Sequence, residues 1–355
     1  MSGKPILIVG SIGLDTVETI SDRRESILGG SATYATVSAG KTADVHLVGI
    51  IGTDFPKEGK KIFEKYSKDL SNLDRKDGQT FSWGGRYPKD WDDRETLFTE
   101  LGVFSNYEPK LTEKNKNTPI IFLGNIHPEL QLSILQQNSK RECVIIDTMN
   151  LWIDTARKKL KEVISYCDVL LLNEFEAEQF TRRKNHDDQG AVLQSLGPQQ
   201  VIIKCGKKGA RLYSGHSVET IGVFPVKNVV DPTGAGDAFG GGLAAAVAHG
   251  ESIQEAIING SAMASLCIEG FGIESLDHAS NDEIDHRKEY LHNHDNHYYH
   301  LLHHIHQYNL SYHHHKYHIH HILRLIHMFH HIQMDLPHHN HILNLHYHHN
   351  HMCHL

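Results

Sequence analysis

Residues 231–242 read Asp-Pro-Thr-Gly-Ala-Gly-Asp-Ala-Phe-Gly-Gly-Gly, a glycine-rich turn that leads into a run of small residues ending at Gly250. Glycine lets the backbone approach a ligand closely, and the free N–H groups at a helix N-terminus bind anions. Asp237 lies at the mouth of this expected anion site. Its carboxylate would repel a phosphate that is merely bound, yet it is the group needed to deprotonate a hydroxyl that attacks phosphorus. The stretch therefore predicts a phosphoryl-transfer site at the start of a helix.

The same stretch is open to other interpretations. The spacing of Gly234, Gly236 and Gly240 imitates a dinucleotide-binding fingerprint, but it occurs late in the chain and has an acidic residue at its centre. The glycines can also serve only to start a helix, with Asp237 interacting with the helix dipole. A Walker A loop is excluded because no Gly-Lys-Ser or Gly-Lys-Thr follows. The glycine triplet at 240–242 would weaken an exposed helix, so we expect it to pack closely against a neighbouring element.

Short apolar runs alternate with helical patterns through the rest of the body, which is typical of an α/β fold with a mostly parallel sheet. Such nearly continuous apolar strands are expected where both faces of the sheet are covered. The strand candidates are Ile6–Val9, Val45–Ile51, Ile120–Leu123, Val144–Ile146, Val169–Leu172 and Val201–Lys204. The helix candidates include Glu58–Leu70, Pro128–Gln137 and Asp154–Ile164. Segments 16–28 and 79–104 are polar, and we expect antiparallel strands set apart from the main sheet, as in a lid.

The sequence resembles the ribokinase/PfkB family of carbohydrate and nucleoside kinases, and the resemblance covers roughly residues 4–290. The stretch Asp231–Ala244 matches the C-terminal signature of that family position for position. The resemblance implies a ribokinase-like three-layer α/β sandwich with a mostly parallel central sheet and a small β lid. It also implies that the Gly234-Ala235-Gly236 amides form the anion hole for the migrating phosphoryl group and that Asp237 is the base.

A second element, Asn173-Glu174-Phe175-Glu176, follows the strand that ends at Leu172. It resembles the Asn-x-x-Glu motif of the family, which implies that Asn173 and Glu176 hold phosphates and water-coordinated Mg²⁺. Binding of Mg²⁺ through few carboxylates and substrate phosphates agrees with the reluctance of that ion to lose water. The same four residues also fit a capping box, and the two roles can coexist.

A third element lies near the N-terminus, where Gly13-Leu14-Asp15 follows the first strand and a helix opens after Gly29-Gly30. The resemblance implies that Asp15 binds acceptor hydroxyls and that Gly29 and Gly30 form the hinge between sheet and lid; a simple turn aspartate is the alternative for Asp15. Tyr34 replaces an Asn that commonly contacts the sugar in the family. Its ring can stack on a base or sugar face, or it can simply fill space.

Further features fit the same family. The strand ending at Lys204, followed by a turn with Gly206 and Gly209, resembles the hairpin at the nucleotide edge, although exposed hairpin glycines alone explain such a turn. Asp231 and Thr233 match positions that bind a monovalent cation such as K⁺ in some members. Asp147 ends a strand and either faces the acceptor or belongs to an ordinary turn.

The function implied is transfer of the γ-phosphate of ATP, with Mg²⁺, to a hydroxyl of a small sugar. Two alternatives are kept. A nucleoside kinase of the adenosine kinase type would do the same chemistry on a ribose carrying a base, and Trp83, Tyr87, Trp91 and Phe98 in the 79–104 segment could cover a larger acceptor. The second alternative is a non-catalytic protein that binds a metabolite. The resemblance also allows a homodimer formed through the lids.

Composition bounds the other classes of function. The chain has 355 residues, 39% of them hydrophobic and 22% charged, and its net charge is −8. An acidic body argues against a nucleic-acid groove, which needs clustered Lys and Arg. No apolar run is long enough for a membrane span, and the N-terminus does not have the pattern of a signal peptide, so we expect a cytosolic protein. The five cysteines lack CxxC spacing, which favours reduced thiols.

Histidine is the one anomaly of the composition. Of 31 His, seven precede residue 291 and 24 lie in residues 291–355. This segment has no Gly, Ala, Val or Glu, so residues with codons beginning in G nearly vanish. The bias is typical of a wrong reading frame or a noncoding repeat. A low-complexity tail, disordered or not native, and a metal-binding or pH-responsive tail are the alternatives. We therefore expect the kinase domain to occupy residues 1–290.

Overall fold

A computed structural model describes residues 3–88 and 94–294 of the chain, and it contains two separate β-sheets. The larger has nine strands in the order β13-β12-β11-β10-β9-β8-β1-β4-β5. All its pairings are parallel except those of β11 with β12 and of β12 with β13. Its strands are β1 (Ile6–Val9), β4 (Val45–Ile51), β5 (Asp69–Arg75), β8 (Ile120–Leu123), β9 (Cys143–Asp147), β10 (Val169–Asn173), β11 (Gln200–Lys204), β12 (Ala210–Ser214) and β13 (Ser217–Ile221).

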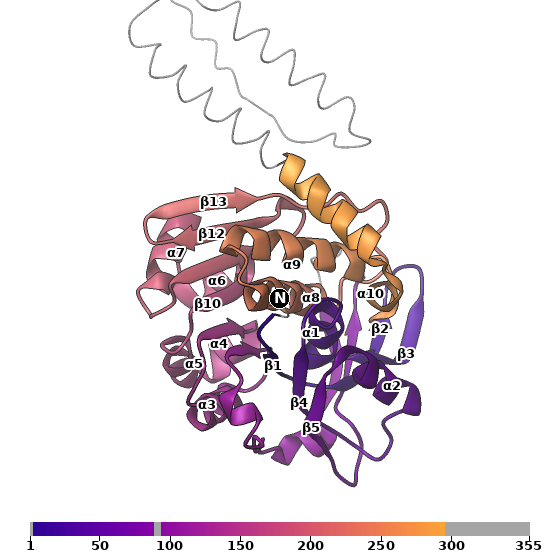
Figure 1. Cartoon of the computed structure of the whole chain (residues 1–355). Coiled ribbons are helices and arrows are strands. Elements are labelled where there is room, and N and C mark those ends of the chain that lie inside the picture. Colours follow the sequence, from indigo (N-terminus) through magenta and orange to yellow (C-terminus); the bar gives the residue numbers. More distant parts are fainter. Residues whose placement is uncertain (1–2, 89–93, 295–355) are drawn as a thin grey trace, which may run out of the picture. The chain divides into compact units, whose positions relative to one another are not determined.

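Helices cover both faces of this sheet, which gives three layers (Figure 1). Side chains alternate along β1, so that Ile6 and Ile8 join the core beneath α1, α8 and α9, whereas Leu7 and Val9 join the core beneath α3 to α7. This two-sided burial is why the strands read as unbroken apolar runs. The helices are α1 (Ser31–Ala39), α2 (Lys57–Tyr66), α3 (Pro128–Gln137), α4 (Asn150–Thr155), α5 (Arg157–Ile164), α6 (Glu174–Thr181), α7 (His186–Gln194), α8 (Ala235–His249), α9 (Ile253–Cys267) and α10 (Glu274–His278), with 3-10 turns at Gly102–Asn106, Asn115–Asn117 and Gly206–Lys208.

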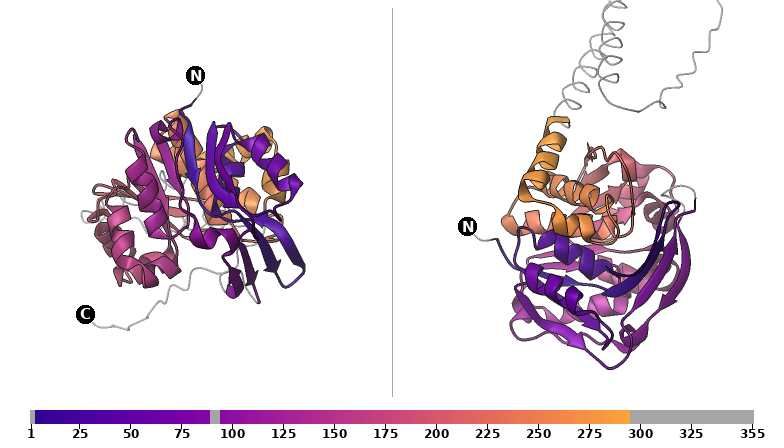
Figure 2. Two further views of the ribbon diagram at one scale, coloured as in Figure 1. Left: turned by 90° about the horizontal axis from the view of Figure 1, so that it is seen from below. Right: turned by 90° about the vertical axis from the view of Figure 1, so that its right-hand side faces the viewer.

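The smaller sheet has the order β3-β2-β6-β7 and extends from one side of the body (Figure 2). Its strands are β2 (Gly13–Glu18), β3 (Arg23–Gly29), β6 (Ser82–Arg86) and β7 (Glu95–Glu100). The strands expected within 16–28 and 79–104 are therefore present and separate from the main sheet. The pairings β2–β3 and β6–β7 are antiparallel as expected, whereas β2 and β6 are parallel. The role of this sheet as a lid stays a prediction.

Two helix predictions were wrong in their bounds. Residues 58–70 do not form one helix, because α2 ends at Tyr66 and Leu70 belongs to β5. The Lys68 N–H donates to the Val45 carbonyl, which begins the pairing of this segment with β4 and stops the helix. Residues 154–164 are split at Ala156, whose φ of −130° and ψ of 25° close α4 and precede α5.

The glycine triplet packs as predicted. α8 lies between α1 and α9, and a side chain at any of the three positions would collide with a neighbour. An added Cβ would lie 2.4 Å from the Phe122 ring at Gly240, 2.4 Å from the Ala35 carbonyl oxygen at Gly241 and 2.8 Å from Met263 at Gly242. The small side chains let α8 approach both the sheet and its neighbouring helices.

The body ends in a helix over residues 281–294, which begins at Ser280 and buries Leu291 in the main core at 1% exposure. The expected boundary near residue 291 thus falls inside this helix. The histidine-rich segment lies outside the described residues from residue 295 on. We expect a chain ending at residue 294 to melt at the same temperature as the full chain, because the core residues described above all precede residue 295. A large fall in Tm on this truncation would show that the segment contributes to the fold.

Two findings bear on the expected compartment and redox state. In residues 3–88 and 94–294, no helix combines the length and hydrophobicity of a membrane span. The four cysteines in these ranges are all free, and Cys167, Cys205 and Cys267 are buried. Cys353 lies outside the described residues.

Candidate active site

The anion site predicted at residues 231–242 lies at the start of α8. Its N-cap, Gly234, has φ 78°, and a side chain there would meet the Tyr34 ring at 2.4 Å, so both the backbone and the close approach need glycine. The Ala235 N–H donates to the Pro232 carbonyl at 3.2 Å and is engaged in the turn. The amides of Gly236 and Asp237 belong to the first turn of the helix, where intrahelical acceptors are lacking. This end of α8 can therefore attract an anion.

Two charged side chains from the main sheet meet beside this helix terminus. Lys204 at the end of β11 and Asp147 at the end of β9 form an ion pair of 2.8 Å between Nζ and Oδ2, with side chains 17% and 5% exposed. A Cβ added at Gly236 would lie 3.1 Å from Lys204 Nζ. The ammonium group thus lies next to the first turn of α8. An anion bound at this terminus would have both backbone dipoles and a shielded cation beside it.

Two carboxyl groups of the site, those of Asp237 and Glu176, have raised pKa values. Burial and the nearby charge of Asp147 raise the pKa of Asp237 to about 7, and Lys204 opposes this rise. Burial also raises the pKa of Glu176 to about 7, with Lys204 lowering it and Asp147 adding to the rise. Burial would lower the pKa of Lys204, but the charges of Asp147 and Glu176 outweigh that effect and raise it. One ammonium therefore faces three carboxyl groups.

This excess of carboxyl groups fits a divalent cation. Mg²⁺ is bound in proteins through one or two carboxylates, with retained water and substrate phosphates as its other ligands. Glu176 supplies such a carboxylate beside the Asn173 amide, and the Asp147 carboxylate, paired with Lys204, lies near the start of α8. The donor chemistry of the residues present is thus compatible with Mg²⁺.

Asn173 and Glu176 form a complete capping box at the start of α6. The Asn173 side chain accepts from the Glu176 N–H at 2.8 Å, and Glu176 Oε2 accepts from the Asn173 N–H at 2.8 Å. The capping interpretation of this motif is therefore observed. Glu176 is 8% exposed and interacts with Lys204 and Asp147, so the motif contributes to a charged cluster that consists of Lys204, Asp147, Glu176 and Asp237.

The predicted acceptor residues converge at the end of β1. This strand lies between β4 and β8, where the strand order reverses, and ligands of open α/β sheets bind outside the carboxyl ends of strands at such a point. Asp15 is 3% exposed. A Cβ at Gly29 would lie 2.0 Å from Asp15 Oδ2, and one at Gly30, where φ is 89°, would lie 2.5 Å from the Ser11 carbonyl oxygen. Both glycines are thus required by close approach.

Two buried polar atoms near this point lack hydrogen-bond partners among the described residues, namely Asp15 Oδ1 and the Tyr34 hydroxyl. Burial raises the pKa of Asp15 to about 7, while the backbone N–H groups of Gly30 and Trp83 oppose the rise. Burial, with the charges of Asp231 and Asp15, also raises the pKa of Tyr34. Unsatisfied buried polar atoms are costly, so a ligand that supplied hydrogen bonds to these two atoms would be stabilised here.

Asp231 and Thr233 tie the turn before α8 to its surroundings. Asp231 is fully buried, and its carboxylate accepts from the N–H groups of Thr233 at 2.8 Å and Gly272 at 3.2 Å. The Thr233 hydroxyl lies 3.1 Å from the hydroxyl of Tyr87, which is next to the end of β6. The smaller sheet is thereby linked to the glycine-rich turn.

Known proteins are similar to this chain in sequence and in structure. A cytidine kinase of Thermococcus kodakarensis is 30% identical over 259 residues, covering 71% of this chain and 91% of that protein. The chain belongs to the pfkB family of carbohydrate kinases. The family model itself matches residues 129–278, and membership makes this protein a phosphotransferase.

Solved structures share the ribokinase fold. The nucleoside kinase of Methanocaldococcus jannaschii, described as an archaeal member of the ribokinase family, matches with a TM-score of 0.67 and 22% identity over 81% of this chain and 99% of that one. The ribokinase of Arabidopsis thaliana complexed with ribose and ATP matches with a TM-score of 0.66, also at 22% identity and over 81% and 99% of the two chains. The predicted ribokinase-like sandwich is confirmed.

Not every residue predicted for the nucleotide lies in the charged cluster of this kinase. Gly209 has φ 87°, and a Cβ there would lie 2.0 Å from the Ile221 carbonyl oxygen, so the hairpin itself requires this glycine. Gly206 has φ 54° and open space around it, as at an exposed turn. Lys204 faces the start of α8 rather than the hairpin turn.

Sequence reasoning gave too little weight to two residues of the kinase. Asp147 was left between an acceptor contact and an ordinary turn, yet it is the ion-pair partner of Lys204. Its place at the carboxyl end of a parallel strand, next to the strand that ends at Asn173, was the available signal. Trp83 was named only as part of a cover, but its backbone N–H interacts with Asp15. The pairing of β2 with β6 that brings them together was not deducible from the sequence.

Proposed function

We propose that this kinase transfers the γ-phosphoryl group of ATP to a hydroxyl of a ribofuranosyl acceptor, and that the acceptor is a nucleoside. The observation that carries the proposal is the meeting of Asp237, the amides at the start of α8 and the ammonium of Lys204 at one point. A base, an anion site and a cation are the parts that phosphoryl transfer needs.

In the proposed reaction, Asp237 accepts the proton of the attacking hydroxyl as its oxygen forms a bond to the γ-phosphorus. The bond from that phosphorus to the bridging oxygen breaks, and ADP leaves. The amides of Gly234, Ala235 and Gly236 and the ammonium of Lys204 would stabilise the charge on the transferred group; Ala235 would have to exchange its turn hydrogen bond for the phosphate. Glu176 and Asn173 would hold Mg²⁺ through water, and that ion supplies neutralisation of phosphate charge.

The acceptor is proposed to bind between Asp15 and the smaller sheet. Asp15 Oδ1 and the Tyr34 hydroxyl are the unsatisfied atoms that ribose hydroxyls can pair with. A nucleoside is favoured over a free sugar by Trp83, whose ring is half-buried, stacks over Gly85 and lies within 5.4 Å of the Arg94 guanidinium. The Trp83 backbone N–H interacts with Asp15, which puts this residue near the proposed ribose position, and its ring would exchange the Arg94 guanidinium for a stacked base. The cytidine kinase relative also supports this choice.

Asp15→Asn tests the acceptor site. The amide keeps the shape of the side chain but loses the anionic acceptor of hydroxyl protons, so we expect the KM for the acceptor to rise at least about tenfold, which corresponds to about 1.4 kcal/mol. The KM for ATP should stay unchanged. Asp22→Asn, at an exposed turn of the same sheet, is the matched control. An unchanged acceptor KM in Asp15→Asn would exclude this residue from the acceptor site.

The pH dependence tests the base. Asp237 acts in its ionised form, and its pKa of about 7 lies well above the ordinary value for Asp. We therefore expect kcat/KM to fall as the pH drops below about 7, by about tenfold per unit or more steeply where Glu176 titrates with it, and to level off above. Rates measured at saturating Mg²⁺ between about pH 5 and about pH 9 check this. A profile flat down to about pH 5 would contradict the assigned base.

A panel of nucleosides and free pentoses with ATP tests the substrate class through ADP release. The proposal expects turnover with nucleosides to exceed that with ribose in kcat/KM. The opposite order would favour the sugar kinase, for which the Arabidopsis ribokinase with bound ribose and ATP is the structural parallel. Binding without any ADP would instead indicate a metabolite-binding protein.

Three further expectations stay predictions. Stimulation of the rate by K⁺ over Na⁺ would support the cation role of Asp231 and Thr233. Sedimentation would show whether the chain forms the homodimer expected through its smaller sheets. Fractionation of the source cells would test the cytoplasmic location.

A further inference from the structure

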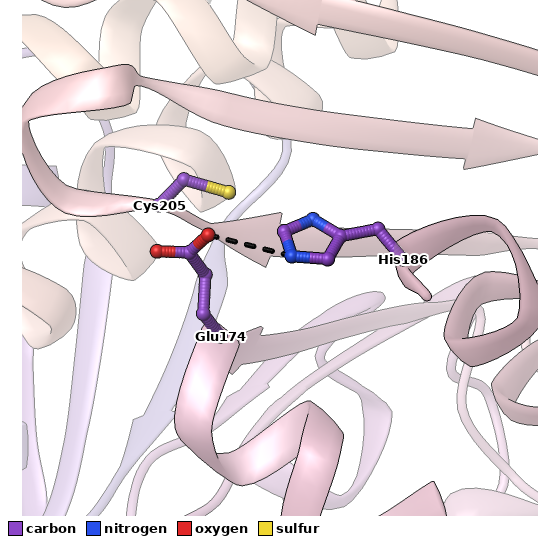
Figure 3. A group of neighbouring side chains, drawn as sticks. All are labelled: Glu174, His186 and Cys205. Atoms are coloured by element: carbon purple, nitrogen blue, oxygen red, sulfur yellow. Dashed lines mark ion pairs between the residues drawn. The ribbon is translucent and has the colours of Figure 1, made fainter. Parts of the chain in front are cut away.

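Three side chains with different donor atoms converge at one place (Figure 3). Glu174 is the first residue of α6, His186 is the first residue of α7, and Cys205 directly follows β11. A carboxylate oxygen, an imidazole nitrogen and the thiol sulfur of these residues all lie within 4.8 Å of one another. His186 Nε2 points to Glu174 Oε1 at 3.5 Å. None of the three has a part in the reaction proposed above.

The surroundings leave these donors available to an ion. Cys205 is buried, and His186 and Glu174 are half-buried, so the three donors are partly shielded from water. The Cys205 thiol donates to the Ile203 carbonyl at 3.3 Å, and this weak bond would be lost when a metal ion replaces the thiol proton. His186 Nδ1 is buried without a hydrogen-bond partner among the described residues, so no second hydrogen bond fixes the ring there. Lys208 Nζ lies 3.4 and 3.5 Å from the two Glu174 oxygens, but its side chain is 64% exposed. Such an exposed and long ion pair is weak and can be displaced by a metal ion.

The donor set identifies the class of ion. On metal binding the Cys205 thiol would release its proton to water, and the thiolate, the carboxylate and a neutral imidazole then carry two negative charges together, which balance one divalent cation. Sulfur and nitrogen donors favour Zn²⁺, whereas Mg²⁺ prefers oxygen alone. Three protein ligands leave a fourth tetrahedral position for water, and that number is typical of zinc sites that are not purely structural.

We propose that Glu174, His186 and Cys205 bind one Zn²⁺ ion, with water as the fourth ligand. The ion would connect the starts of α6 and α7 to the end of β11. No ion is needed to fold these elements, since α6 has its own capping box and α7 is capped by the Asn185 side chain. The site is therefore one for reversible binding.

Cobalt spectroscopy on the full chain tests this proposal. Co²⁺ takes zinc positions, and a cobalt–thiolate bond gives a near-ultraviolet charge-transfer band that histidine ligands alone do not give. The band thus separates this site from the 24 histidines of residues 291–355. After treatment with a chelator, the protein should develop the band with one equivalent of Co²⁺, and Zn²⁺ should remove it. Absence of the band would overturn the proposal.

Substitutions show which residues bind the metal ion that gives this band. Cys205→Ser should abolish it, whereas Cys353→Ser, in the histidine-rich segment, should leave it intact. Loss of a residue that only supports a metal ligand lowers metal affinity by roughly 10- to 100-fold. His186→Gln removes a proposed ligand, so it should lower the affinity for Co²⁺ by more than that. A band that survives in Cys205→Ser, or disappears in Cys353→Ser, would place the metal elsewhere. Equal melting temperatures of the metal-free proteins would show that the variants fold.

A functional consequence rests on the proposed function. Glu174 directly follows Asn173, which is proposed above to hold Mg²⁺, and Cys205 directly follows Lys204, which is proposed to stabilise the phosphoryl group, so the ion would lie beside residues that contact the phosphates of ATP. We expect Zn²⁺ to raise the KM for ATP in the wild-type chain and not in Cys205→Ser. If the wild-type chain gives the cobalt band but Zn²⁺ does not raise its KM for ATP, the proposed place of ATP would be contradicted. If the wild-type chain gives no cobalt band, the metal site would be contradicted.

Discussion

Asp237→Asn is expected to lose nearly all phosphorylation while the protein remains folded. The amide has the size and shape of the carboxyl group but cannot accept the proton of the attacking hydroxyl. Base assistance of this kind contributes about 10²- to 10⁴-fold, and we expect kcat to fall within that range. The measurement is ADP release at saturating ATP and acceptor, in a coupled assay.

The stability of the same variant provides its control. The folded-state pKa of Asp237 is about 7, whereas an Asp in an unfolded chain has a pKa of about 4. Ionisation of this group therefore costs stability as the pH rises from about 4 to about 7. The neutral amide removes this cost, and the variant should melt no lower than the wild type at about pH 8. Asp282→Asn, exposed on the C-terminal helix, should change neither property. Retained turnover in Asp237→Asn would remove this residue from the mechanism.

Lys204→Met is expected to have the second large effect, on both rate and stability. The ammonium lies next to Gly236 at the start of α8, where the transferred phosphoryl group would acquire its charge. Loss of one such stabilising group costs about 10²- to 10³-fold in kcat. The substitution also leaves Asp147, 5% exposed, without its partner, and breaking a buried pair costs about 3–5 kcal/mol.

A double variant separates the two effects. In Lys204→Met with Asp147→Asn, the Asp147 charge is no longer left unpaired, so the free energy of unfolding should recover part of its loss, while Asp237 and Glu176 still lack the ammonium. The rate should not recover, because the phosphoryl group still lacks the cation. The acidic limb of the pH profile should also move to higher pH in Lys204→Met, since Lys204 lowers the pKa of Asp237. Recovery of the wild-type kcat in the double variant would show that Lys204 only neutralises Asp147.

The main sheet could be predicted from the sequence because its chemistry is local. Each parallel strand is covered on both faces, and continuous apolar runs such as Ile6–Val9 follow from that burial. The end of α2 could not be predicted in the same way. Residues 67–70 continue a helical pattern, and only pairing with β4 makes the segment a strand.

The geometry of the glycine-rich turn and of the start of α8 was predictable for a similar reason. The turn at Gly234 and the packing of 240–242 depend on glycine at fixed positions, so the sequence shows them directly. The partnership of Lys204 with Asp147 spans 57 residues and arises from the order of strands in the sheet. The burial of Tyr34 also depends on tertiary structure, because its ring packs against Gly234 from a distant helix while its hydroxyl lacks a partner among the described residues.

The most direct test of the central claim is product analysis by mass spectrometry. Full-length protein with ATP, Mg²⁺ and a nucleoside should give equal amounts of ADP and of the nucleoside monophosphate, and Asp237→Asn should give neither. ADP formed without a phosphorylated acceptor, or a bound nucleoside with no ADP at all, would contradict the account.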